Sequence, residues 1–302
     1  MTAKGFRMFK RLSPGDKVFQ VVVYIYLTIA FLLVIGPLMY VVSSSLSSVS
    51  AVFAGRVTLF PVEFHIDAYR AVFASQRIMR GFRNSVNYTL VGTFFTLIVL
   101  TMVAFPLSRK DLFGRGAITG FFAFTMLFSG GMIPSYINIQ NLGLIDTFWV
   151  MVIPGGIGVM HMAIMRTYFS SNIPYELYES AQMDGCRDIK FLLTVVLPLS
   201  GPIFAVLGLF NAVGAWNSFF HALLYLVDQD KYPLQVHLRN ILILNRGDGD
   251  MQGAVGDDRF RAGMGQVIQF AVIVVSSAPL LMIYPFIQKF FVKGVMIGAL
   301  KG

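Results

Sequence analysis

The sequence predicts an all-α integral membrane protein with six transmembrane helices. Of its 302 residues, 56% are hydrophobic and 13% are charged, whereas a soluble chain carries about 25% charged residues. The apolar residues are gathered in six long stretches without Asp, Glu, Lys or Arg. An ionised side chain at the bilayer centre costs at least about 2.5 kcal/mol, so such stretches indicate spans. They do not alternate with period two, which argues against a β-barrel.

The six charge-free stretches define the expected spans and the domain organisation. Each is close to or longer than the about 20 residues that a helix needs to cross a bilayer core. The stretches are 18–55, 84–108, 116–145, 147–165, 191–227 and 262–288. We therefore expect an N-terminal tail (1–17), a six-helix transmembrane domain (18–292) and a C-terminal tail (293–302).

Basic residues set the expected orientation. One acid, Asp16, accompanies five basic residues before the first span, so the positive-inside rule places the N-terminus in the cytoplasm. The five are Lys4, Arg7, Lys10, Arg11 and Lys17. Six spans then place both termini on the cytoplasmic side of a bacterial inner membrane. The net charge of +9 is spread over span ends, which indicates contact with membrane lipid and no nucleic-acid binding.

The residues needed for metal or ATP chemistry are lacking. Cys186 is the single cysteine, the four His lack metal-ligand spacing, and there is no G-x-x-x-x-G-K-[ST] phosphate loop. We expect no enzymatic activity, no metal and no cofactor bound by this chain. The predicted external loop 228–261 is acidic in part but fits no EF-hand template, so we expect a solvated docking surface. Its acids of interest are Asp248, Asp250, Asp257 and Asp258.

The longest predicted cytoplasmic loop, 166–190, should contain two short helices. Pro174 suits a first helical position, and Glu176 and Glu179 fall in the first turn, where the helix dipole favours acids. Gly185 provides a stop. The candidate capping residues are Ser171 or Asn172 for the first helix and Asp188 for the second. Such a helix pair with a partly apolar face is a docking element for a groove in a partner.

The same segment resembles the EAA motif of binding-protein-dependent ABC importers, E-A-A-x3-G-x9-I-x-L-P. The spacing matches throughout, with Ser180 in place of Ala and Val195 in place of Ile. In the family this segment (170–191) forms coupling helices in a cleft of the ATPase subunit. The resemblance therefore implies Glu179 as an ion-pairing residue and Gly185 as the turn. The implied coupling residues are Glu176, Glu179, Ser180, Ala181, Asp184, Gly185 and Pro198.

The resemblance extends over almost the whole chain, toward the carbohydrate-uptake branch and its maltose-permease-G-like subunits. It rests on Phe60-Pro61, Asp67-Ala-Tyr69, Arg83-Asn84-Ser85 and the tail 291–302. It implies the MetI-like fold of ABC type I importer permeases, closest in look to alginate-type oligosaccharide or polysaccharide permeases. Implied partners are a second homologous permease in a heterodimer, two ATPase subunits carrying ATP and Mg, and an extracytoplasmic solute-binding protein. The tail residues Lys301 and Gly302 would reach the ATPase pair or anchor at the membrane edge.

Saccharides stack on aromatic rings and hydrogen-bond to amides, so aromatics beside Asn at membrane depth are candidates for the substrate path. Span five offers four such residues: Asn211, Trp216, Asn217 and Phe220. In span three, Gly130, Gly131 and Pro134 should break the helix and line the path or form a hinge. The alternative is structural, because Trp is common at membrane interfaces and Asn joins helices.

Two other functions stay open at this point. The EAA-like segment alone does not identify cargo, so an ABC permease for another solute class is one alternative. A secondary transporter working without an ATPase is the other. The latter requires ionisable residues inside spans, and there the sequence offers His161 and His221 alone.

Overall fold

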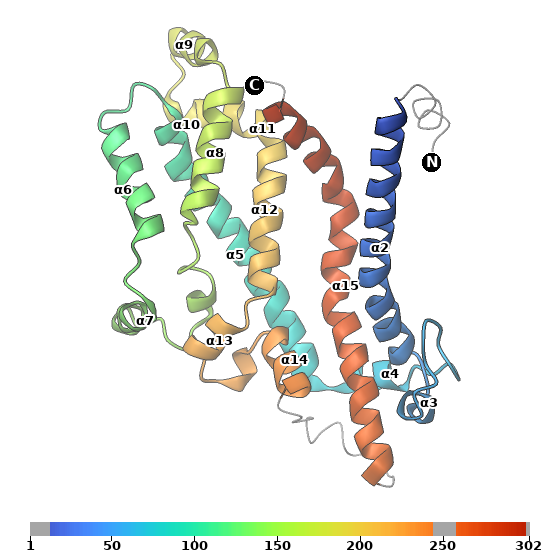
Figure 1. Cartoon of the computed structure of the whole chain (residues 1–302). Helices are drawn as coiled ribbons and strands as arrows, with labels where there is room; N and C mark the ends of the chain where they lie inside the picture. Colours follow the sequence, from blue (N-terminus) through green and yellow to red (C-terminus); the bar gives the residue numbers. More distant parts are fainter. Residues whose placement is uncertain (1–12, 244–257, 300–302) are drawn as a thin grey trace. The chain divides into compact units, whose positions relative to one another are not determined.

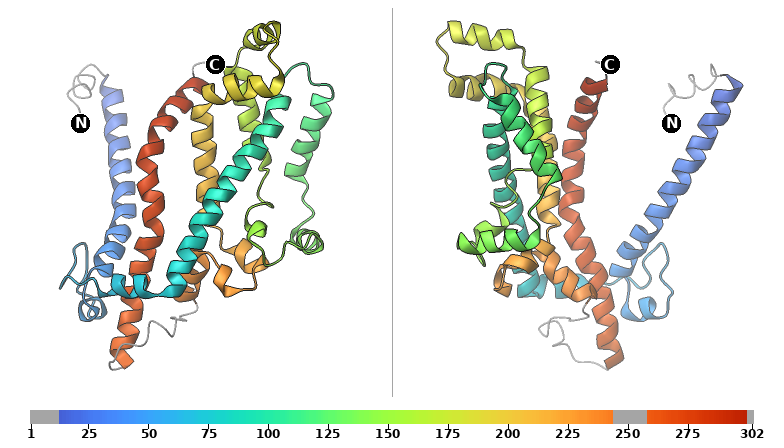
Figure 2. Two further views of the ribbon diagram at one scale, coloured as in Figure 1. Left: turned by 180° about the vertical axis from the view of Figure 1, so that it is seen from behind. Right: turned by 60° about the vertical axis from the view of Figure 1, so that its left-hand side comes forward.

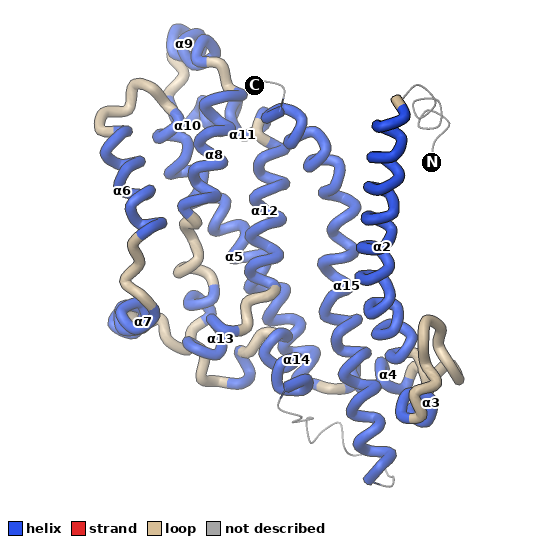
Figure 3. The backbone as a smooth tube through the Cα atoms, viewed as in Figure 1, coloured by secondary structure: helices blue, strands red, loops and turns tan. Residues whose placement is uncertain are grey.

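A computed structural model describes residues 13–243 and 258–299, and both ranges are mostly helical (Figure 1). The backbone of these residues forms helices and loops without a β-strand (Figure 3). The predicted all-α class is therefore confirmed. Several residues of interest lie outside the described ranges: Lys4, Arg7, Lys10, Arg11, Asp248, Asp250, Asp257, Lys301 and Gly302.

The chain divides into two compact units. The first comprises Met1–Val72 and Gly247–Val275, and the second comprises Phe73–Arg246 and Ser276–Gly302. The helices in the described part of the first unit are α2 (Pro14–Ser45), α3 (Val49–Phe53), most of α4 (Asp67–Ala74) and the first part of α15 (Asp258–Ala299).

In the first unit, α2 is long and apolar enough to cross a membrane. It begins because the Ser13 hydroxyl accepts a hydrogen bond from the Asp16 amide at 3.2 Å and Pro14 occupies the first turn. The chain folds back after α2, where the Ser43 hydroxyl donates to the Leu59 carbonyl at 2.7 Å. This hydrogen bond thus fixes the segment that follows α2 against the end of the helix.

The second unit is organised around α5 (Gln76–Ser108). Its other helices, within the described residues, are α6 (Arg115–Leu127), α7 (Met132–Asn141), η1 (Phe148–Met151), α8 (Val159–Asn172), α9 (Tyr175–Met183), α10 (Asp188–Phe191), η2 (Leu192–Val196), α11 (Leu197–Leu199), α12 (Gly201–Trp216), α13 (Phe220–Tyr225), η3 (Gln229–Lys231) and α14 (Leu234–Ile243). α5 contacts α8, α12 and α14, and α9 projects beyond the ends of α5, α8 and α12 (Figure 2).

Small residues on one face of α5 explain why three helices pack on it. The buried positions recur every three or four residues, which is the period of one helix face. Among them are the small residues Gly81, Ser85, Thr96, Thr101 and Ala104. In a membrane, small side chains let helix backbones approach closely, and this packing replaces the hydrophobic driving force.

In the part of the chain that the structure describes, three helical segments are each long and apolar enough to cross a membrane: Pro14–Ser45, Gln76–Ser108 and Met264–Pro285. Two bent pairs raise the number of candidate spans to five. The predicted count of six spans therefore stays a prediction.

The third predicted span is broken where the glycines were expected to break it. α6 ends at Leu127, α7 begins at Met132, and the two helices are bent by 117°. Gly131 has φ of 86°, a conformation that side chains disfavour. Pro134 is not the cause, because it lies in the first turn of α7, where the amide hydrogen has no helical partner.

The fourth predicted span is not one helix, and that prediction is wrong. Residues 148–151 form the 3-10 helix η1, residues 152–158 are irregular, and α8 starts at Val159. The irregular part contains Pro154, Gly155 and Gly156, which disfavour a continuous helix through lost hydrogen bonds and backbone entropy.

The fifth predicted span begins later than expected. Residues Asp188–Leu199 and Gly201–Trp216 are bent by 82° at Ser200, so the charge-free start of this stretch lies outside the long helix. Pro198 and Pro202 flank the bend and cannot donate backbone hydrogen bonds. The segment 192–196 before the bend is a π-helix.

Two predicted polar or flexible segments are helical in part. In the loop 228–261, α14 packs on α5, where the buried Leu234 donates its amide hydrogen to the Ser85 hydroxyl at 2.8 Å. The prediction of a solvated surface is therefore wrong for α14, which is an amphipathic helix. α15 continues to Ala299, through most of the predicted tail 293–302.

Charged residues fasten the end of the second unit that contains α14. The Lys231 amine lies 2.6 Å from Oδ2 of Asp146, and Oδ1 of the same carboxylate accepts backbone hydrogen bonds from Val227 and Asp228. The bond from Lys231, followed by the backbone bonds, lowers the pKa of Asp146 to about 2. From α5, Asn84 donates to the Asp230 carbonyl at 2.8 Å.

Close packing at Gly81 gives a test of this arrangement. A Cβ there would lie 2.6 Å from Cδ2 of His237 and 3.3 Å from Cα of Leu234, whereas a Cβ at Gly92 would meet no atom within 4 Å. We expect Gly81→Ala to lower the free energy of unfolding by about 1–3 kcal/mol. Gly92→Ala, the matched control, should be neutral or slightly stabilising. Thermal unfolding of both variants in detergent measures this, and equal melting temperatures would contradict the packing.

Candidate functional site: the α9–α10 helix pair

The helix pair α9–α10 lies where the sequence predicted two short helices. Gly185 has φ of 71° and forms the turn, as expected, and its amide donates to the Gln182 carbonyl at 2.9 Å. The capping predictions are wrong. Pro174 is the N-cap of α9, and the Asn172 side chain instead donates to the Tyr168 carbonyl of α8. Asp188 is the first residue of α10.

One side of α9 faces outward with an acidic and apolar stripe. Glu176, Glu179, Ser180 and Met183 follow the spacing of a single helix face and all four are exposed, Met183 to 89%. Neither Glu176 nor Glu179 forms an ion pair with any residue that the structure describes. The two carboxylates of this stripe are therefore available to pair with a cation of another protein.

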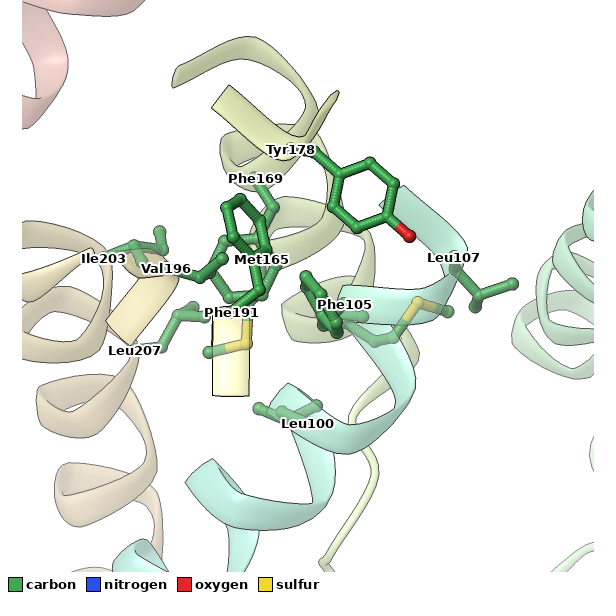
Figure 4. Close-up of a cluster of buried hydrophobic side chains, with 12 residues drawn as sticks. Leu100, Phe105, Leu107, Met165, Phe169, Tyr178, Phe191, Val196, Ile203 and Leu207 are labelled. Carbon is green, nitrogen blue, oxygen red and sulfur yellow. The ribbon is translucent and has the colours of Figure 1, made fainter. Parts of the chain in front are cut away.

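The opposite side of α9 is anchored to the core of the second unit. The Tyr178 ring is 5% exposed and packs edge-on against Phe191 of α10, with ring centroids 5.3 Å apart. Both rings belong to an apolar cluster with residues of α5, α8 and α12, among them Phe105 and Phe169 (Figure 4). Ala181 also packs against this cluster. α9 is thus held at a fixed distance from the long helices.

Arg109, directly after α5, ties the helix pair to the end of that helix. Its guanidinium lies 2.5 Å from carboxylate oxygens of both Asp111 and Asp188, and it donates to the Tyr178 hydroxyl. Its central carbon lies 4.0 Å from the centroid of the Tyr178 ring, a cation–π contact. The Tyr178 hydroxyl in turn donates to Asp188 at 2.9 Å. With 15% of its side chain exposed, Arg109 is largely shielded from competing water.

The electrostatics of this network favour the ionised carboxylates. Hydrogen bonds from Arg109 are the main cause that lowers the pKa of Asp111 and of Asp188. Because both folded-state pKa values lie below their usual values, the stabilisation is present at neutral pH. It is lost as the pH falls through the lowered pKa values. Burial, aided by the hydrogen bond to Asp188, raises the pKa of Tyr178, so its hydroxyl stays protonated.

Sequence reasoning missed Arg109 and Tyr178. The turn 109–115 contains three basic residues and one acid, and this local pattern indicates no partner for Arg109. Arg109 and Tyr178 are far apart in the chain, and nothing in the local pattern links them. The remaining predicted coupling residues lie on or beside the helix pair: Asp184 ends α9, and Pro198 lies in α11 before the bend.

The predicted substrate-path residues separate into two groups. Trp216 is 3% exposed and its indole donates to the Ser276 carbonyl at 3.0 Å, so it is a packing residue in this conformation. Asn211 donates to the carbonyl one turn earlier in α12. Asn217 and Phe220 are exposed at the α12–α13 junction. Gly130 and Gly131 lie away from α12 and α13, in the loop between α6 and α7.

Comparisons with known proteins give a consistent result. No protein-family model matches the chain. The chain is 40% identical over 292 residues to the polygalacturonan/rhamnogalacturonan transport system permease protein YtcP of Bacillus subtilis (strain 168), covering 95% of this chain and 99% of the relative. It is 39% identical over 294 residues to Protein LplC of the same organism, covering 96% and 97%.

Solved structures are similar as well. One is a chain of a bacterial ABC transporter involved in the import of the acidic polysaccharide alginate, with a TM-score of 0.85, 33% identity, and 93% and 99% of the two chains covered. A second comes from a bacterial alginate ABC transporter in complex with a periplasmic protein bound to alginate pentasaccharide. At 14% identity and a TM-score of 0.55, over 90% and 93% of the chains, it shows the fold alone.

The Arg109 network predicts how the helix pair responds to loss of that charge. We expect Arg109→Gln to speed hydrogen exchange of the amides in 175–191 about tenfold, since losing charge-assisted hydrogen bonds removes about 1.4 kcal/mol or more. Arg187→Gln is the matched control, because Arg187 is exposed and forms no ion pair with the described residues. Hydrogen exchange followed by mass spectrometry measures both. Equal exchange in the two variants would show that Arg109 does not hold the pair.

Proposed function

The chain belongs to the permease subunits of carbohydrate ABC transport systems, and on this basis we propose that it forms half of a saccharide translocation path. The observation that carries the membership is 40% identity over nearly the full length of both proteins. The relatives disfavour the two alternatives, a permease for another solute class and a transporter working without an ATPase. As a transport subunit, the chain would leave ATP hydrolysis to partner subunits.

The proposed assembly contains three kinds of protein partner. A second homologous permease completes the path, two ATPase subunits bind ATP and Mg, and an extracytoplasmic binding protein delivers the saccharide. The periplasmic protein in one similar structure supports the last of these. In this proposal both termini lie on the cytoplasmic side of the bacterial inner membrane, with the residues from 293 onward, including Lys301 and Gly302, extending toward the ATPase pair.

The chain is proposed to cross the membrane six times. The fourth crossing would combine the irregular residues 152–158 with α8, because irregular backbone is tolerated at membrane depth where protein or water surrounds it. The charge-free stretch 147–165 supports this reading.

Coupling to ATP is proposed to act through α9. Its outward stripe offers two unpaired carboxylates and the exposed Met183 to a cleft in the ATPase subunit, with Glu179 pairing to a cation there. A movement of α9 would reach α5 through Tyr178 and Arg109, and α8 and α12 through their contacts with α5. ATP binding would then shift the permease pair between inward-open and outward-open states.

The proposed cargo is an acidic polysaccharide or a fragment of one. Polygalacturonan and alginate, named for two similar proteins, both carry carboxylates. The arginines near the Asp146 end do not by themselves indicate an anionic cargo, since Arg80 pairs with Asp230. For cargo contact, exposed Phe220 provides a ring face, and exposed Asn217, whose Nδ2 donates to the Val213 carbonyl at 2.9 Å, provides its side-chain oxygen as an acceptor.

A copurification experiment tests the assembly and the cargo together. We expect the chain, extracted in mild detergent, to carry ATPase subunits whose turnover rises with a binding protein loaded with galacturonate or alginate oligosaccharides. Neutral oligosaccharides such as maltotriose should not raise it. ATPase stimulation by neutral sugars alone would contradict the acidic cargo, and a chain that copurifies without any ATPase would contradict the importer.

A charge reversal on α9 tests coupling. We expect Glu179→Lys to reduce transport and sugar-stimulated ATPase activity at least about tenfold, because a lysine repels a cation in the cleft and the pair is worth 1.4 kcal/mol or more. Glu179→Asp keeps the charge and serves as the control. Membrane insertion should be unchanged in both variants, as measured by yield and melting temperature. Wild-type transport by Glu179→Lys would remove Glu179 from the coupling mechanism.

A further inference from the structure

A pocket of about 230 Å³ lies where α5 and α8 end and α9 begins. Its floor is apolar: Phe105, Phe169, Phe191 and Val196 line it and belong to the buried cluster (Figure 4). Its rim is polar and basic, formed by Arg109, Lys110, Arg115, Ser170, Ser171 and Glu176. The pocket thus combines an apolar floor with hydroxyl groups and an excess of cations.

The basic residues on the rim differ in whether they form ion pairs with carboxylates. Arg109 pairs with two carboxylates, Asp111 and Asp188, so it adds no net positive charge to the rim. Lys110 and Arg115, in contrast, form no ion pair with any acid in the part of the chain that the structure describes. The Lys110 amine lies 5.8 Å from the centroid of the Tyr175 ring. Glu176 is the single acid among the lining residues.

A further arginine adds to the positive potential beside the pocket. Arg166 donates from Nε to the Leu107 carbonyl at 3.0 Å, which holds its guanidinium near the end of α5. Within the described residues, neither Arg115 nor Arg166 forms an ion pair with a carboxylate, so both charges are available to an external anion.

The position of the pocket identifies the source of that anion. The charge-free stretches 84–108 and 147–165 end directly before Arg109 and Arg166, so the rim lies at the predicted edge of the hydrocarbon core. Basic pockets between transmembrane helices at this depth bind lipid headgroups. A free phosphate would use the rim and leave the aromatic floor without a ligand.

We propose that this pocket binds the phosphate of an anionic phospholipid. Lys110 and Arg115 pair with the phosphate oxygens, the Ser171 hydroxyl donates a hydrogen bond, and the start of an acyl chain covers the apolar floor. The volume suits a glycerophosphate group and the first methylene groups, with the remaining chain in the bilayer. Because Tyr175 also lines the pocket, the lipid would contact the first turn of α9.

Native mass spectrometry of the detergent-purified complex tests the proposal. The probes are phosphatidylglycerol, phosphatidylcholine and inorganic phosphate. We expect the wild type to retain phosphatidylglycerol in preference to phosphatidylcholine. Each of Lys110→Gln and Arg115→Gln should weaken this retention about fivefold, from about 1 kcal/mol per basic residue near a membrane surface. Lys17→Gln, which removes a basic residue near another predicted span end, is the control and should bind like the wild type.

Each other outcome overturns the proposal in a distinct way. Unchanged retention in the double variant of Lys110 and Arg115 would place the lipid elsewhere. Displacement of phosphatidylglycerol by millimolar inorganic phosphate would make the site a free-anion site. Binding only after the ATPase subunits are removed would assign the pocket to an acidic segment of the partner. Melting temperature checks that the variants are folded, and lipid retention is read independently of transport, so it does not depend on the proposed cargo.

Discussion

The guanidinium of Arg109 is the contact on which the geometry of the candidate site depends. It joins the end of α5 to both short helices, because one cation meets Asp188 at the start of α10 and the Tyr178 ring of α9. Asp111 is the second carboxylate that pairs with Arg109. Without this cation, α9 would be held by the hydrogen bond from Tyr178 to Asp188 and by apolar contacts, which define distance better than direction.

The remainder of the second unit follows from the surface of α5. Its small residues bring α8, α12 and α14 close, so the contacts that position the Arg109 end also position the other helices. The middle and the ends of α5 therefore have different structural roles. Small, uncharged side chains pack the middle, and polar side chains at both ends attach the segments that must be placed with defined orientation.

The sequence predicted much of this fold and less of the site. Missing charge indicated the helical class, and Gly131 and Gly185 indicated turns, because these properties are local. The break in 147–165 was not predicted, since an apolar composition does not distinguish a helix from irregular backbone that other helices surround. Trp216 was a candidate for sugar contact, yet its indole has a backbone partner in α15. The partner of Arg109 could not be predicted either, because pairings between distant segments leave no mark on composition.

Attachment at both ends has a mechanical consequence for α5. Asn84 and Tyr88 bond to the carbonyls of residues 230–232 near one end, and Arg109 holds the helix pair at the other. A helix of 33 residues is about 50 Å long and resists compression along its axis. It therefore moves as a rigid rod: a tilt of about 5° about one end displaces the other end by about 4 Å. Because both ends are attached, such a tilt would move the segment 230–232 and the helix pair together.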